Sequence, residues 1–97
     1  MILHTLNTGT DTAAFRDCLN LASASDAILL MGNGVYAALD RTTASASLQA
    51  TGAEIFVLES DARAAGIVSR IPKFASLVDF EGFVSLTVRF DRQLAWY

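Results

Sequence analysis

The stretch DAILLMGNGVYAAL, residues 26–39, decides how this chain folds. Residues 27–31 form an unbroken apolar run that is too short for a typical independent helix, and the breaker cluster Gly-Asn-Gly at residues 32–34 follows at once. Such a run predicts a strand that is buried on both faces, as in a parallel sheet between helices. Apolar residues then recur at helical spacing from Val35 onward. We expect a strand, a tight turn and a helix, with any site at the carboxyl end of the strand.

Strand and helix patterns alternate on both sides of this stretch. We predict further strands over residues 1–6, 54–58, 76–78 and 93–97, and helices over residues 12–24, 44–50, 60–65 and from residue 80 onward. The expected N-caps are Thr10 or Asp11 for the first helix, Glu59 or Ser60 for the third and Asp79 for the fourth. A βαβ series of this kind predicts an α/β protein, with one domain over residues 1–97. Its architecture would be three-layer α/β/α, with a doubly wound, mostly parallel sheet of about five strands.

The composition is unusually apolar. Hydrophobic residues make up 53% of the chain and charged residues only 18%, which is more apolar than a lone soluble domain usually is. We therefore expect a partner to cover part of the surface, with homo-oligomers as a substitute when the chain is isolated. No apolar run reaches the roughly 18 residues that cross a bilayer, and no signal-peptide pattern is present, so we expect a cytoplasmic protein without membrane association. The net charge of -3 argues against direct binding of nucleic acid.

The chain has one cysteine, Cys18, and one histidine, His4. One of each excludes an internal disulfide and a typical Cys/His zinc site, and we expect no metal or cofactor. Cys18 falls on the apolar side of the first predicted helix, beside Phe15 and Leu19, which favours a packing role over nucleophilic chemistry. His4 lies in the first predicted strand with no evident acid to orient it, so we expect a structural, hydrogen-bonded histidine.

Three other features have weaker functional meaning. The Gly-Asn-Gly turn could form a backbone nest for an anion, although the dinucleotide glycine pattern and the phosphate-loop lysine are both missing. The acidic residues, Asp26 among them, are spread over caps and turns and are expected to be mostly solvated. Five aromatic residues gather toward the C-terminal end, and we expect part of this set to form a subunit interface. They are Phe80, Phe83, Phe90, Trp96 and Tyr97.

Several segments, in order along nearly the whole chain, resemble the TusB/DsrH family. They are MILHTL at residues 1–6, ILLMGNGVYAA at 28–38, VL at 57–58 leading into DARAAG at 61–66, VDFEGFVSLT at 78–87 and QLAW at 93–96. The resemblance implies a DsrE-like fold and a subunit of a cytoplasmic sulfurtransferase complex. It also implies two sister subunits, TusC/DsrF-like and TusD/DsrE-like, assembled with this one as a dimer of heterotrimers.

The resemblance leaves two roles for Cys18. In the Tus branch, the complex passes persulfide sulfur through a small sulfur-carrier protein towards 2-thiolation of the tRNA wobble uridine, and the working cysteine belongs to the TusD-like subunit. This chain would then be mainly a structural, accessory subunit. In the Dsr branch, found in sulfur oxidisers, the corresponding subunit has a cysteine in its first helix, and Cys18 matches that position. Cys18 would then be a persulfide carrier. A small-molecule-binding module built on the glycine turn is a third hypothesis.

Overall fold

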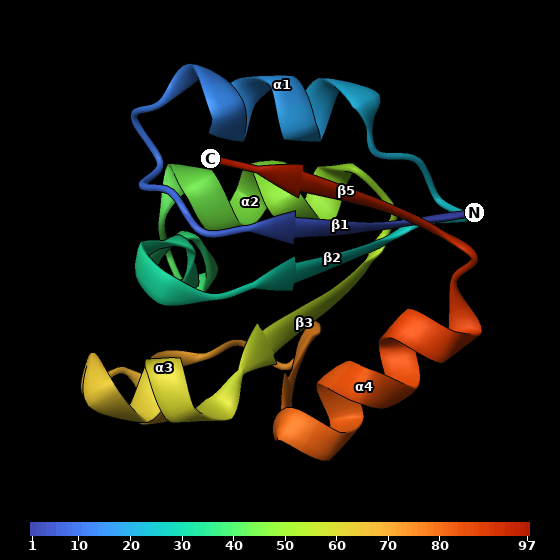
Figure 1. Cartoon of the computed structure of the whole chain (residues 1–97). Coiled ribbons are helices and arrows are strands. Elements are labelled where there is room, and N and C mark those ends of the chain that lie inside the picture. Colours follow the sequence, from blue (N-terminus) through green and yellow to red (C-terminus); the bar gives the residue numbers. More distant parts are fainter.

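Five strands form one sheet in which all neighbours are parallel (Figure 1). The computed structural model describes residues 1–97. The strands are β1 (Ile2–Leu6), β2 (Ala27–Leu30), β3 (Glu54–Leu58), β4 (Ala75–Val78) and β5 (Arg92–Trp96). Their order across the sheet is β4-β3-β2-β1-β5, which confirms the prediction of a mostly parallel sheet of about five strands.

Four α-helices and two 3₁₀ segments connect the strands. They are α1 (Ala13–Leu21), η1 (Gly32–Ala38), α2 (Thr43–Ala50), α3 (Glu59–Ala64), η2 (Val68–Arg70) and α4 (Phe80–Arg89). The chain moves across the sheet in one direction from β1 to β4, so right-handed crossovers place α1, α2 and α3 on one face. It then returns across the sheet to set β5 beside β1, and this return places α4 on the opposite face (Figure 1).

The two faces of the sheet have separate hydrophobic cores, which makes the architecture three-layered. The core under α1, η1, α2 and α3 contains 14 buried residues, whereas the core under α4 contains five. Strand β2 contributes to both, because Ile28 and Leu30 point into the larger core while Ala27 and Leu29 point into the smaller one. All four residues of β2 are fully buried, as the continuous apolar run predicts. One face is therefore much less covered than the other.

The local structure differs from the prediction at two caps and at one helix. Thr12 caps α1 by accepting a hydrogen bond from the Phe15 N–H at 3.2 Å, so the expected cap at Thr10 or Asp11 is wrong. Helix α3 has no side-chain cap. The segment after the glycine turn is the 3₁₀ segment η1 instead of an α-helix. The cap at Asp79 is confirmed, because its carboxylate accepts from the Gly82 N–H at 2.8 Å.

Close packing against β1 explains the second glycine of the turn. A Cβ atom added at Gly34 would lie 2.1 Å from the backbone oxygen of Leu6, the last residue of β1. Since no side chain fits there, the chain after β2 runs directly against the end of its neighbour strand. This contact fixes η1 at the carboxyl edge of the sheet.

Candidate functional site

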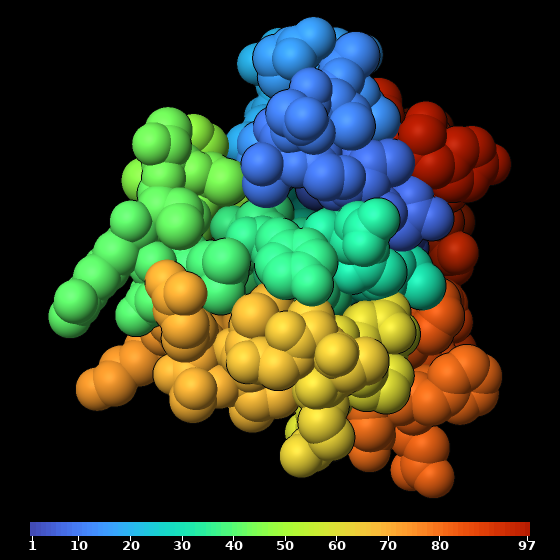
Figure 2. Space-filling model, turned by 90° about the vertical axis from the view of Figure 1, so that its left-hand side faces the viewer, coloured from blue at the N-terminus to red at the C-terminus, as the bar shows by residue number.

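The carboxyl edge of the sheet, where a parallel fold usually places its site, is centred on the glycine turn. Figure 2 looks at this edge, with the turn near the middle of the view. Beside the turn lies a shallow depression of about 230 Å³, lined by residues that include Asn33, Tyr36 and Asp61. The Gly32 N–H donates a hydrogen bond to the Asp61 carboxylate at 2.7 Å. A carboxylate of the chain itself therefore occupies one N–H that the anion-nest hypothesis requires.

Cys18 lies in the larger core, beneath α1. Its side chain is completely buried, and the burial raises the pKa of the thiol to about 12. The thiol is therefore protonated at neutral pH and has no contact with solvent in this conformation. The packing position predicted from helical spacing is confirmed. The role of persulfide carrier stays a prediction, since it needs a conformation in which this thiol is reached.

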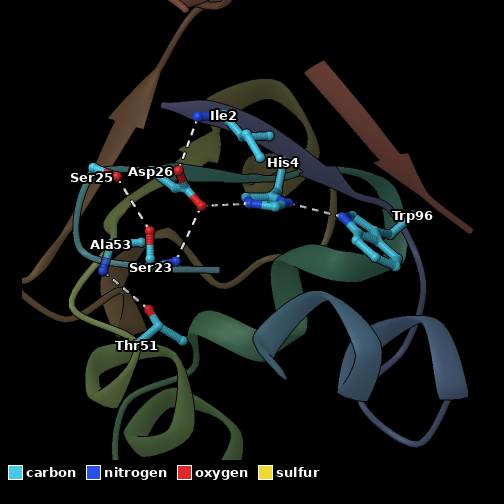
Figure 3. Close-up of polar contacts among 8 residues, drawn as sticks. All are labelled: Ile2, His4, Ser23, Ser25, Asp26, Thr51, Ala53 and Trp96. Carbon is cyan, nitrogen blue, oxygen red and sulfur yellow. Dashed lines mark hydrogen bonds and ion pairs between the residues drawn. The ribbon is translucent and has the colours of Figure 1, made fainter. Parts of the chain in front are cut away.

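A buried row of hydrogen-bonded side chains joins β1, the residue before β2, and β5 (Figure 3). His4 Nε2 lies 3.0 Å from the Oδ2 atom of Asp26, and the indole N–H of Trp96 donates to His4 Nδ1 at 3.0 Å. His4 is fully buried and Asp26 is 4% exposed. Because an indole N–H can only donate, Nδ1 must be the acceptor and Nε2 must bear the ring proton. His4 is therefore a neutral ring that donates to Asp26.

The prediction of a structural, hydrogen-bonded His4 is confirmed, although the sequence showed no evident acid to orient the ring and Asp26 does so. Asp26 is buried and is the exception among acidic residues that were expected to be mostly solvated. Burial alone would raise the pKa of Asp26, but hydrogen bonds from His4 and from the backbone N–H groups of Ile2 and Ser23 outweigh it and lower the pKa. The parallel register pairs Leu3 with Ala27, and this pairing brings residues 22 positions apart into contact. The apolar periodicity of the sequence does not predict how the two strands are aligned.

Three of the eight large apolar residues that are exposed lie on α4, more than on any other element. Phe80 is 72% exposed, Val84 45% and Val88 81%, and their spacing of four residues aligns them along one side of the helix. We call these three residues the α4 stripe. The opposite side of the helix packs on the sheet through Leu86, and Phe90 follows it into the core.

The five C-terminal aromatic residues therefore do not form one surface. Phe90 is a core residue, Phe83 and Trp96 are partly buried, and Phe80 and Tyr97 are exposed. Within this set, only Phe80 and Tyr97 are exposed enough to contribute to the expected subunit interface. No helix is long and apolar enough to span a membrane, and no group of three or more His, Cys, Asp or Glu side chains is placed to hold a metal ion.

Comparisons with known proteins give consistent results. A family model described as DsrH like protein matches residues 9–93. Protein TusB from Yersinia pestis (strain Pestoides F) is 44% identical over 78 residues, which cover 80% of this chain and 82% of that protein. Protein TusB from Yersinia pseudotuberculosis (serotype O:1b, strain IP 31758) matches to the same extent.

Two solved structures resemble the fold described above. The solution structure of protein Tm0979 from Thermotoga maritima superposes with a TM-score of 0.68 at 27% identity, and the match covers 92% of this chain and 93% of that one. The crystal structure of the ychN protein from E. coli superposes with a TM-score of 0.76 at 16% identity, covering 98% and 97%. At that identity the second match supports the fold alone.

Proposed function

This chain belongs to the DsrH-like family and is similar to TusB, and from that membership we propose that it is an accessory subunit of a cytoplasmic sulfur-relay complex. Such a complex passes persulfide sulfur through a small carrier protein towards 2-thiolation of the tRNA wobble uridine. The observation that carries the accessory role is the complete burial of Cys18, which is the one thiol of the chain. With a net charge of -3, the subunit would contact the carrier and not the tRNA.

Sulfur transfer needs a thiolate, because the thiolate is the nucleophile in exchange reactions. The pKa of Cys18 is about 12, so only about one thiol in 10⁵ is ionised at pH 7. The reactive cysteine would therefore come from the TusD/DsrE-like sister subunit. The contribution of this chain would be to hold that subunit in the geometry that meets the carrier.

We propose that the α4 stripe is the surface that binds a sister subunit. Its three side chains present large apolar groups to water on the face of the sheet that α4 covers alone. Burying one such side chain completely is worth about 1.5–3 kcal/mol. A sister subunit of the family is the occupant that family membership supports, within a dimer of heterotrimers that also includes the TusC/DsrF-like subunit.

Co-expression with the two sister subunits tests this surface. We expect Val88→Asp to abolish co-purification of the complex, because it places a charge on the most exposed residue of the stripe, within the apolar contact. Leu21→Asp is the matched control, since Leu21 is also an exposed apolar residue, 51% accessible, but lies on α1 on the other face of the sheet. Circular dichroism of each isolated variant checks that the fold is intact. Loss of the complex in Leu21→Asp alone would move the interface to α1 and reject the proposal for α4.

A persulfide donor distinguishes the accessory role from the carrier role. The native chain, alone and within the complex, is incubated with the donor and weighed. We expect no gain of one sulfur on this chain, and a gain on the TusD-like subunit as the positive control. A one-sulfur gain that disappears in Cys18→Ser would instead establish Cys18 as a carrier. That result would leave family membership intact and reject the accessory role.

A further inference from the structure

We infer that the chain of contacts Trp96, His4 and Asp26 is a pH-operated latch, which holds the edge strand β5 on β1 while His4 is neutral and releases it when His4 is protonated. Figure 3 shows the contacts that form the latch, and none of them involves the thiol of Cys18 or the proposed sulfur relay. The latch joins Trp96, at the end of the chain, to His4 at its start, 92 positions away.

Protonation of His4 and its bond to Trp96 exclude each other. A second ring proton, taken from solvent, goes to Nδ1, because Nε2 already has one and donates it to Asp26. Nδ1 then becomes a donor that faces the donor N–H of Trp96 at 3.0 Å. The Trp96 bond is therefore lost. The bond to Asp26 remains, since two backbone N–H groups hold that carboxylate in place.

The charged and titratable groups around His4 leave Asp26 as its single ionic partner. Asp26 precedes β2 and contacts the ring directly. On α1, Cys18 is buried and its thiol is neutral, whereas Arg16 and Asp17 are exposed. On β5, Arg92 is exposed and lies opposite Ile2. No other carboxylate therefore faces the new Nδ1–H, which is left opposite the indole N–H as a second donor, and the Trp96 contact opens.

The contact of Trp96 with His4 matters for the attachment of β5 to the sheet, because β5 has few other side-chain contacts. It pairs only with β1, and four of its five residues are exposed. Trp96 is the one β5 residue that packs against the hydrophobic core. Without the indole bond, the strand keeps its backbone ladder to β1 but loses its side-chain anchor. We expect the released state to show faster opening of β5, while β2 and β3 stay protected.

The test uses the single tryptophan of the chain as a local reporter. Emission and exchange of the full chain are compared at pH values from about 8 down to 5, the range in which an unperturbed histidine changes charge. Trp96 fluorescence and hydrogen exchange of the β5 amides are measured together. We expect a one-proton change in emission and, after correction for the intrinsic pH effect, about tenfold faster exchange in β5 at low pH, equivalent to about 1.4 kcal/mol.

Two variants make the result decisive. His4→Gln does not titrate, and Trp96→Phe keeps a ring but removes the donor, so we expect β5 exchange to be independent of pH in both. Trp96→Phe still decides the question if His4→Gln fails to fold. A His4 ring resonance that titrates while β5 exchange in the native chain stays constant would overturn the inference. So would an absence of titration between about pH 8 and pH 5.

Discussion

Replacing Gly34 with alanine tests the contact that fixes η1 against β1. The new Cβ would lie 2.1 Å from the Leu6 oxygen, whereas a carbon and a carbonyl oxygen normally stay about 3.3 Å apart. The backbone must therefore retreat by more than about 1 Å. The Leu6 oxygen also accepts the Met31 N–H at 3.0 Å, so the retreat strains the bond that joins the ends of β1 and β2.

The expected loss of stability follows from these two terms. Overpacking costs about 1–3 kcal/mol, and losing the Met31 bond costs about 1 kcal/mol, which together give about 3 kcal/mol. For a domain of this size, that corresponds to a fall in Tm of roughly 12–24 °C. Thermal unfolding followed by circular dichroism measures the change. The measurement is made without ligand, because the expected effect comes from packing alone. For the same reason, loss of ligand-dependent stabilisation in a Gly34 variant would not by itself show that a ligand binds at the glycine turn.

Gly66→Ala is the matched control. Gly66 has a φ of +72°, and no atom lies within 4 Å of its added Cβ. Alanine there meets conformational strain of about 1–2 kcal/mol but no clash. We expect Gly34→Ala to be clearly the less stable of the two variants. Equal Tm values would show that the end of β1 yields easily and would refute the argument from close packing.

Three further predictions concern Cys18, Asp26 and Arg89. Reaction of Cys18 with an aromatic disulfide reagent should be slow in the folded chain and become fast in denaturant, since the thiol is buried with a pKa of about 12; fast labelling without denaturant would show an accessible conformation. Folding lowers the pKa of Asp26, so its ionised carboxylate stabilises the folded chain above the unfolded pKa of about 3.9, and this stabilisation is lost as the pH falls through the folded pKa. Denaturant titrations from pH 5 downward should therefore show a fall in the free energy of unfolding that is smaller in Asp26→Asn. Arg89→Ala should cost only about 0.5 kcal/mol by the same method, since the ion pair of Arg89 with Glu54 is about half exposed, and a loss of several kcal/mol would contradict this.

The sequence predicted the sheet well because its signals are local. The apolar run at residues 27–31 and the glycine turn after it determine a buried strand whatever the rest of the chain does. The position of Cys18 followed from helical spacing in the same way. Apolar spacing after the turn suits an α-helix, but the structure has the 3₁₀ segment η1 there, because the close approach of Gly34 to β1 is a tertiary contact that local spacing does not reveal.

The side of α4 that faces the sheet was not predictable from spacing. Apolar residues occur on several sides of this helix, so its sequence does not show whether Phe80 and Val84 or Leu86 pack against the sheet. The choice depends on how the chain returns across the sheet. The contact between His4 and Asp26 was missed for a related reason, because it depends on the register of two parallel strands.

The pairing of β1 with β5 has a consequence for synthesis of the protein. Ribosomes make β1 well before β5, yet the two strands are neighbours in the sheet. One edge of β1 therefore stays open until β5 has emerged. We expect the pairing of β1 with β5 to be a late step in folding, because contacts so distant along the chain form slowly.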